Sequence, residues 1–379
     1  MKVWGNLRKF LDCTQSKEEG EELPEVFPVL ELPSVVLDVF LKQLGPSERF
    51  KFGFISKRTH NLCKQKWIIP KYPYQILGFS YPPMLSLSFE PDRYISFNFQ
   101  YKTIFKEKGR SFQPNFAGIS FCVAHSRPRT EEKIIEEYTV YCDDDLVDEQ
   151  MRWAKYFCTI FNFQRNFIAI QCLEDGVSEF VEKYKSEIGS SIFQLVIGNR
   201  EDEEHLDGEE LKQLVDSVVV TNFLWIRPPI SEEYNHAVPY SLTRFTSDQS
   251  DGITVEKILN INSYFIDLRN STMTDAEVNA LVHAWRASGN TTLQCLSVKR
   301  NYSEQYVDYE VLGEGLVDEN KTPHVVRKLN WVDGMGNPTT WTSPGGFDVT
   351  REDGRRLTIF VMTIIGDPDC HVFGFHVWS

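Results

Sequence analysis

The amino-acid sequence predicts a protein of the α+β/α/β class: a short three-helix element, then a β-rich segment, then a longer β/α domain that ends in a β-hairpin. Three patterns predict this order. Apolar residues repeat at helical spacing within residues 27–69, alternate with polar residues within 70–143, and switch between helical and strand spacing from 144 to 379. Residues 1–26 are charged and lack such a pattern, so we expect a poorly ordered lead-in.

The three-helix element consists of short apolar helices separated by turn signals. Gly45 ends the first helix and Pro46 begins the second, since proline suits the first turn of a helix. The residues that define the element are Leu32, Pro33, Val36, Phe40, Leu44, Pro46, Phe50 and Phe54. A segment of about 40 residues buries too little apolar surface to fold alone. Its outer apolar residues therefore imply a partner.

The run LPSVVLDVFLKQLGPSERFKFGFISKRTHNL within this element resembles an F-box. F-boxes are three-helix elements that attach F-box proteins to the Skp adaptor of cullin-RING (SCF) ubiquitin ligases. The resemblance implies that the residues named above pack on the Skp adaptor and connect the chain, through it, to a cullin. Thr59 stands where many F-boxes carry a large aromatic residue, which predicts looser packing of the third helix.

Two other interpretations of the element stay open: an internal helical cap on the following domain, and a DNA-binding helix-turn-helix. The segment is basic within an acidic chain, as DNA binding requires. Its basic residues are Arg49, Lys51, Lys57, Arg58, His60, Lys64 and Lys66. A recognition helix also needs exposed polar side chains that read bases, and Phe50, Phe52 and Phe54 leave little room for them. We therefore favour the F-box.

Composition limits the function classes. The chain has 379 residues and a formal net charge of −14, which argues against nucleic acid or an anionic membrane as a partner of the whole chain. Its 8 cysteines are scattered, with neither zinc-ligand nor disulfide-framework spacing. The N-terminus lacks an apolar signal segment. We expect a cytoplasmic or nuclear protein, or one found in both compartments.

The β-rich segment is predicted from alternating apolar and polar residues, and the β/α domain from alternating helix and strand patterns. Between about residues 84 and 141 we predict four strands, several of them in a small antiparallel sheet. From residue 144 the predicted strand cores Ile168, Leu195 and Val219 lie about 25 residues apart, a period typical of leucine-rich-repeat-like β/α units. Residues 227–252 read as an irregular insertion.

The second half contains a well-specified helix. Thr274 and Glu277 predict a capping box, and Gly289 is expected at the C-cap. SYFIDLRNSTMTDAEVNALVHAWRASGNTTLQCLSVKR and the later GGFDVTREDGRRLTIFV resemble the F-box-associated domain, type 2. Asp353-Gly354 predicts a two-residue hairpin turn with Glu352 facing Arg355. The resemblance implies that residues 144–379 form an F-box-associated substrate-recognition domain.

No catalytic or metal-binding motif is found in the sequence. Cys370 and His371 are adjacent, so on a strand they point to opposite faces and would not act together. The acidic run at 201–207 lacks the spaced ligands of a calcium loop. We expect neither catalysis, nor a cofactor, nor a metal, and a solvated position for His283.

A long loop is the candidate contact for a target protein, because aromatic residues and arginines concentrate in it. Its candidate residues are Trp225, Arg227, Tyr234, His236, Tyr240 and Arg244. The resemblance predicts a non-catalytic substrate adaptor of an SCF-type ubiquitin ligase, which acts in the ubiquitin conjugation pathway by bringing a target near the ligase. The alternative is a β/α repeat scaffold that binds proteins without assembling a ligase.

Overall fold

The protein was analysed as a computed structural model, and its chain divides into two compact units. Unit 1 comprises Met1–Phe167 and Glu182–Gly189, and unit 2 comprises Ile168–Val181 and Ser190–Ser379. The residues described are 29–31, 33–53, 56–65, 74–80, 82–90, 93–101, 111–112, 115–116, 119–120, 122–126, 134–142, 145–161, 163, 165–171, 176–198, 207–229, 241–301, 307–316, 327–332, 338–343, 346–364 and 367–378.

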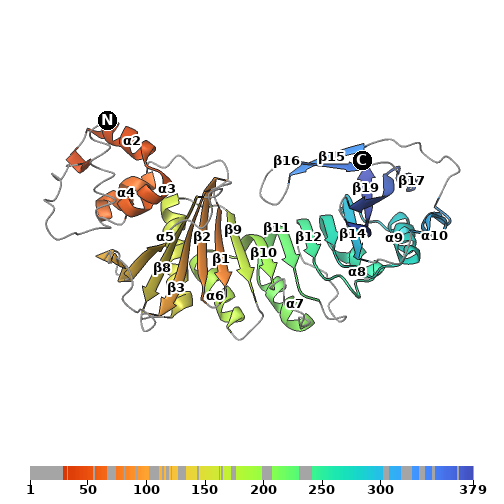
Figure 1. The fold of residues 1–379 in the computed structure, drawn as a ribbon, viewed down its shortest axis with the longest axis horizontal. Helices are drawn as coiled ribbons and strands as arrows, with labels where there is room; N and C mark the ends of the chain where they lie inside the picture. The colour runs from red at the N-terminus through yellow and green to blue at the C-terminus, as the bar shows by residue number, and fades with distance from the viewer. Residues whose placement is uncertain are drawn as a thin grey trace. The chain divides into compact units, whose positions relative to one another are not determined.

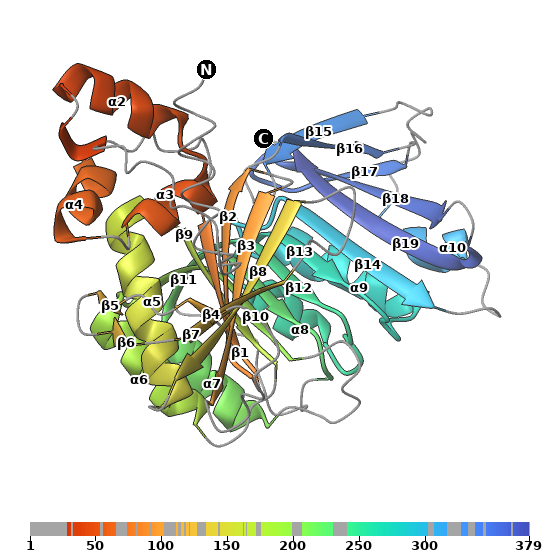
Figure 2. The ribbon, with the colours of Figure 1, turned by 60° about the vertical axis from the view of Figure 1, so that its left-hand side comes forward.

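Unit 1 contains short helices and one long helix that packs on a sheet. The described helices that lie wholly in it are η1 (Val29–Glu31), α2 (Ser34–Gln43), α3 (Pro46–Gly53), α4 (Lys57–Gln65) and α5 (Leu146–Phe161). Figure 2 shows α5 running along one face of the sheet, with α3 and α4 near one end of it. α6 (Val177–Glu187) and β9 (Arg165–Ile170) contribute residues to both units. The predicted boundary at residue 144 differs from the unit boundary, since α5 belongs to unit 1.

The sheet of unit 1 contains the predicted antiparallel pairs, but it has more strands than we predicted and one parallel pair. Its strand order is β1 (Tyr74–Phe79), β2 (Met84–Glu90), β3 (Arg93–Tyr101), β8 (Ile134–Cys142), β7 (Cys122–Ser126) and β4 (Ser111–Phe112). β3 and β8 are parallel, from Arg93↔Ile134 to Tyr101↔Cys142, and the other pairs are antiparallel. Residues 102–133 supply the long crossover that a parallel pair needs. β5 (Asn115–Phe116) and β6 (Ile119–Ser120) form a separate pair.

The core of unit 1 is aromatic. The ring centroid of Phe50, in α3, lies 5.3 Å from that of Phe97 in β3 and 5.6 Å from that of Phe157 in α5. Trp153 in α5 and Tyr138 in β8 complete this cluster, at 6.1 Å and 5.7 Å from Phe50. All five side chains are buried. The helix α3 is therefore part of the core that α5 and the sheet form together.

Unit 2 is an α/β structure. Its parallel strands are β10 (Ser191–Ile197), β11 (Val219–Ile226), β12 (Leu242–Ser247), β13 (Ser263–Leu268) and β14 (Cys295–Asn301). Three antiparallel strands continue the order: β19 (Asp367–Trp378), β18 (Arg356–Ile364) and β17 (Phe347–Thr350). The hairpin β15 (Arg327–Val332) and β16 (Pro338–Ser343) is separate.

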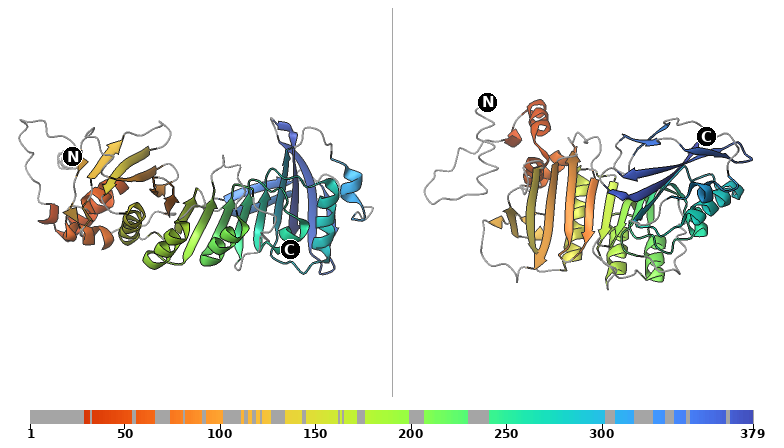
Figure 3. Two further views of the ribbon diagram at one scale, coloured as in Figure 1. Left: turned by 90° about the horizontal axis from the view of Figure 1, so that it is seen from below. Right: turned by 45° about the vertical axis from the view of Figure 1, so that its right-hand side comes forward.

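The helices of unit 2 cover one face of its parallel strands, as Figure 1 and Figure 3 show for α7, α8 and α9. The helices that lie wholly in unit 2 and are described are α7 (Gly208–Ser217), α8 (Val255–Asn260), α9 (Asp275–Ala287) and α10 (Tyr309–Gly313). Strand residues directed to this face, such as Leu224, Phe245 and Ile266, are fully buried. The mixed α/β class is thus confirmed.

β12 lies where the sequence predicts an irregular insertion, so that prediction is wrong for residues 242–247. Only Leu242 and Phe245 in this strand are large and apolar, so its sequence lacks the apolar alternation typical of a strand. The strand is defined by parallel pairing on both sides, in which Phe223, Arg244 and Phe265 share one register row. Long-range hydrogen bonding, rather than local periodicity, makes it a strand.

The hairpin between β17 and β18 also differs from the prediction. Arg351 N donates to Arg355 O at 2.9 Å, so a three-residue loop separates the paired residues and Glu352 does not face Arg355. Gly354 has φ +87°, a left-handed conformation that glycine adopts without penalty. Arg351 Nε also donates to Asp353 Oδ1 at 3.0 Å. The arginine therefore stabilises a longer turn than Asp-Gly alone suggests.

The helix α9 confirms the predicted capping box. Glu277 N donates to Thr274 Oγ1 at 3.3 Å and Thr274 N donates to Glu277 Oε2 at 2.7 Å. Its C-cap is Ser288, one residue before the predicted Gly289. Both Ser288 N and Ser288 Oγ donate to Trp285 O, at 3.1 Å and 2.9 Å. A serine that satisfies a terminal carbonyl replaces the expected glycine cap.

Candidate protein-binding sites

The outer face of α2 is the first candidate site. Val35, Val36 and Val39 are 72%, 47% and 55% exposed, while Leu37 and Leu41 on the opposite side are buried. We call these three valines the valine face. The other exposed large hydrophobic side chains among the described residues, Val219, Tyr264 and Tyr309, are scattered over unit 2. A cluster of three on one short helix is typical of a protein contact.

A buried arginine connects the helices beneath the valine face. Arg49 Nη2 donates to Cys63 O at 2.9 Å, and Arg49 Nη1 donates to Leu41 O at 3.4 Å. Burial lowers the pKa of Arg49 to about 10, and the nearby Cys63 opposes this shift. Arg49 thus ties α3 to α2 and α4. Because α3 is in the core of unit 1, the valine face stands on a supported helix.

Thr59 has a different role from the one that we predicted. Its residue is 1% exposed, and its hydroxyl donates to Ser56 O at 2.8 Å. Ser56 N donates to Thr59 Oγ1 at 2.9 Å, and Thr59 N donates to Ser56 Oγ at 3.1 Å. These reciprocal bonds close the N-terminus of α4 in the manner of a capping box. The sequence prediction did not include this capping role of Thr59.

The second candidate site is the face of the unit 2 sheet opposite its helices. Arg244 in β12 lies between two phenylalanine rings of the neighbouring strands. Its Cζ is 5.2 Å from the Phe223 ring centroid and 4.9 Å from that of Phe265. Arg244 Nη2 also donates to Asp267 Oδ2 at 2.8 Å. Stacking on two rings and an ion pair hold this guanidinium in place.

The arginine cluster continues toward the carboxyl ends of the strands. Arg269 Nη2 lies 3.1 Å from Asp267 Oδ2, and Arg269 Nη1 lies 3.0 Å from Asp248 Oδ1. Two cations lie close to the Trp225 ring, with Arg227 Cζ at 4.5 Å and Arg269 Cζ at 5.5 Å from its centroid. We call Arg227, Arg244 and Arg269, with the rings and carboxylates that they contact, the arginine cluster.

The arginine cluster is built on the segment that comparison with known proteins identifies. Residues 233–298 match the F-box associated family. No curated protein and no solved structure matches the chain. The F-box-associated segment spans β12, α8, β13, α9 and most of β14. The predicted F-box-associated resemblance is confirmed over these residues, whereas the later stretch at 345–361 lies outside the match.

The structure brings part of the predicted target site together on the F-box-associated segment and the strand before it. Trp225, Arg227 and Arg244 belong to the arginine cluster, whereas Tyr234, His236 and Tyr240 lie outside the described residues. The sequence prediction missed Phe223, Phe265, Asp267, Arg269 and Asp248. The signal that could have found them is the equal spacing of Phe223, Arg244 and Phe265, which form one register row.

The predicted adaptor-binding residues divide into exposed and buried ones. Pro33 and Val36 are exposed and Phe40 is half-buried, with its ring 5.8 Å from that of Phe52. Leu44 and Phe50 are buried inside unit 1, so the structure does not offer them to a partner. Pro46 begins α3, and Leu32 and Phe54 lie outside the described residues. Val35 and Val39, which the sequence prediction omitted, complete the exposed face.

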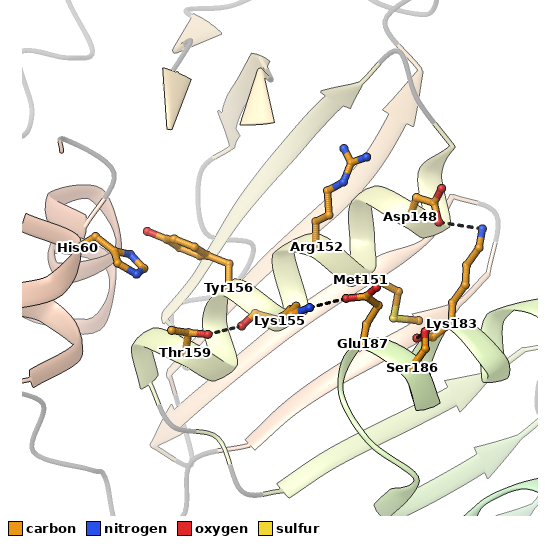
Figure 4. Close-up of a pocket in the computed structure, with 10 residues that line it drawn as sticks. All are labelled: His60, Asp148, Met151, Arg152, Lys155, Tyr156, Thr159, Lys183, Ser186 and Glu187. Carbon is orange, nitrogen blue, oxygen red and sulfur yellow. Dashed lines mark hydrogen bonds and ion pairs between the residues drawn. The ribbon is translucent and has the colours of Figure 1, made fainter. Parts of the chain in front are cut away.

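A groove of about 730 Å³ lies beside α5 in unit 1 (Figure 4). Its charged side chains are already paired: Lys155 Nζ lies 2.6 Å from Glu187 Oε2, and Lys183 Nζ lies 2.9 Å from Asp148 Oδ1. The remaining lining residues are His60, Met151, Arg152, Tyr156, Thr159 and Ser186. Internal pairing leaves the groove with little surplus charge for a ligand.

Neither a metal-binding group nor a membrane-spanning helix is found among the described residues. In the described part of the chain, no group of three or more His, Cys, Asp or Glu side chains could hold a metal ion. No described helix is long and apolar enough to cross a membrane. The acidic run ends at Asp207, which caps α7 by accepting from Glu209 N at 2.8 Å. His283 is exposed and its Nε2 lies 3.0 Å from Glu314 O.

Proposed function

We propose that the protein is a non-catalytic substrate-recognition subunit of an SCF-type ubiquitin ligase. In this proposal α2 and its neighbours bind the Skp adaptor, which connects the chain to a cullin, and unit 2 binds a target protein. The observation that carries the proposal is the valine face, an apolar surface on a supported helix that precedes an F-box-associated segment. Action of this kind takes place in the cytoplasm or the nucleus.

The mechanism is proximity. An adaptor that holds a target lysine beside the ubiquitin thioester raises the effective concentration of the reacting groups, so the adaptor needs no catalytic residue. The match to the F-box associated family over residues 233–298 supports this role. The valine face supports adaptor binding because burying exposed apolar side chains contributes about 25 cal/mol per Å² of apolar surface removed from water.

The test compares two valine-to-aspartate variants of similar exposure. Val36 in α2 and Val219 in β11 are 47% and 46% exposed. The chain is co-expressed with the Skp adaptor and analysed by size-exclusion chromatography. We expect the wild type and Val219→Asp to elute as a complex with the adaptor. Val36→Asp should lose the complex, because it places a charge in an apolar contact. Circular dichroism melting would verify that both variants fold.

The contrary result would favour the repeat scaffold. If the wild-type chain is monodisperse and does not bind the adaptor, the valine face has another partner and the ligase assignment fails. If Val36→Asp still co-elutes with the adaptor at the wild-type yield, the binding face lies elsewhere on the chain. Phe40→Asp is a poorer probe, because Phe40 also packs on Phe52 and its loss would disturb α3.

A further inference from the structure

The arginine cluster contains one guanidinium without an acidic partner. Arg244 and Arg269 each pair with a carboxylate, at 2.8 Å and 3.0 Å. Arg227 stacks on Trp225 but forms no ion pair with any residue that the structure describes. Its Nε atom is buried and has no hydrogen-bond partner among the described residues. Among the described contacts, the Trp225 ring therefore positions this guanidinium, and no described carboxylate neutralises its charge.

Among the described residues, the side chains around Arg227 carry an excess of positive charge. Three arginines share it with two carboxylates, those of Asp248 and Asp267. Lys299 follows Val298, which pairs with Leu268 of β13, and alternation along the strand places Lys299 on the same face as Ser297. Lys299, too, has no ion pair within the described residues. In a chain of net charge −14, this patch is the complement of an acidic ligand.

The backbone holds Arg227 in place. Arg227 N donates to Ile197 O at 3.0 Å, Asp248 N donates to Ile226 O at 2.9 Å and Arg269 N donates to Ser247 O at 2.8 Å. These bonds extend the parallel ladder to the carboxyl ends of the strands, where ligands bind in open α/β sheets. Because the backbone of these residues is already ordered, binding would cost little conformational entropy there.

We propose that the arginine cluster binds a carboxylate side chain, Asp or Glu, on a segment of the target protein. Arg227 pairs with the carboxylate, and Trp225 packs against the apolar part of the neighbouring target residue. The fork of an arginine suits bidentate pairing with a carboxylate. This inference rests on the proposed function, because it names the chemistry of the target that unit 2 would bind.

A carboxylate fits this surface better than a phosphate does. The donors of Arg244 and Arg269 are engaged with Asp267 and Asp248, so Arg227 is the arginine of the cluster without an acidic partner. One carboxylate oxygen, Asp248 Oδ2, is buried without a hydrogen-bond partner. A group that carries about two negative charges would be repelled by Asp248 more strongly than a singly charged carboxylate.

The test uses the full chain and pools of short fluorescent peptides with identical randomised flanks. The pools differ in one fixed central residue, which is Glu, Gln, Lys or phosphoserine, and binding is followed by fluorescence anisotropy at low salt. We expect the Glu pool to bind about tenfold more tightly than the Gln pool. Arg227→Gln should remove this preference. Arg286→Gln, an exposed arginine in the last turn of α9, is the matched control and should keep it.

Equal binding of the Glu and Gln pools by the wild-type chain would overturn the inference. So would tightest binding of the phosphoserine pool, or a preference for Glu that survives Arg227→Gln. Arg227→Lys gives a further readout, because it keeps the charge without the fork and should keep only part of the preference.

Failure of this inference is distinguishable from failure of the proposed function. Co-elution with the Skp adaptor is measured on the same proteins, and Arg227→Gln lies in unit 2, far along the sequence from α2. Adaptor binding without a Glu preference overturns the inference alone. A Glu preference without adaptor binding overturns the ligase assignment and leaves the arginine cluster as a peptide-binding surface.

Discussion

The ring of Phe360 in β18 covers Gly374 in β19 so closely that a β-carbon at residue 374 would overlap the ring. The two residues are direct partners in the antiparallel register. Gly374 thus provides the space in which the aromatic ring lies, and both residues are buried. This pairing contributes to the packing of β18 on β19 in unit 2.

Gly374→Ala should destabilise the protein by about 1–3 kcal/mol, because the added methyl group forces the Phe360 ring out of its position. Urea unfolding followed by circular dichroism would measure the loss. Gly289→Ala is the control, since a β-carbon there would meet no atom within 4 Å and should change stability little. Equal stability of the two variants would show that the sheet adjusts freely around Phe360.

Asp267→Asn should reduce the free energy of unfolding by about 2–4 kcal/mol. Asp267 is 9% exposed and accepts from Arg244 and Arg269, so the substitution leaves two partly buried guanidiniums with a neutral partner. Asp216→Asn is the matched control, because its ion pair with Lys212 is exposed and should matter little. Chemical denaturation of both variants tests this, and an equal loss would contradict it.

Thr59→Val should destabilise unit 1 by about 1 kcal/mol, since it removes the hydroxyl that closes the N-terminus of α4 while keeping the volume of the side chain. Thr159→Val removes a hydroxyl that donates to Lys155 O on the exposed side of α5, and we expect almost no effect there. Thermal unfolding would compare them. A Thr59→Val variant as stable as the wild type would exclude the capping role.

Cys63→Ala should show a pH-dependent loss of stability. Burial raises the pKa of the Cys63 thiol from 9.0 to about 11, and Arg49 opposes the shift. Because the folded pKa lies above the unfolded one, the stabilisation by Cys63 is complete below pH 9 and is lost as the pH approaches 11. The difference between wild type and Cys63→Ala should shrink by up to about 2 kcal/mol over this range.

Urea titrations at several pH values would measure the effect of Cys63. Leu41→Ala is the control, because Leu41 is fully buried beside the same helices and has no titratable group. The loss from Leu41→Ala relative to the wild type should stay constant between pH 9 and 11. If the loss from Cys63→Ala is equally constant, the thiol does not titrate as its burial implies.

Short-range patterns made some elements predictable from the sequence. The capping box of α9 depends on Thr274 and Glu277, which lie three residues apart, so their side chains meet whatever the remainder of the chain does. The alternation of strands and helices from β9 to β11 follows in the same way from local apolar periodicity. The exposed Val36 and the clustered Arg244 were predicted only as members of larger sets.

Only the tertiary structure decided which of the predicted adaptor-binding residues are exposed. Val36 and Phe50 belong to one predicted adaptor-binding set, but Phe50 packs on Phe97, Trp153 and Phe157, which lie far along the chain. In the same way β12 is a strand because two strands pair with it, and among the described residues Asp248 pairs with Arg269 and not with Arg227. Spacing in the sequence determines which side chains share a face of a helix or strand. Contacts between segments far apart in the chain determine which faces are covered and which charges remain unpaired.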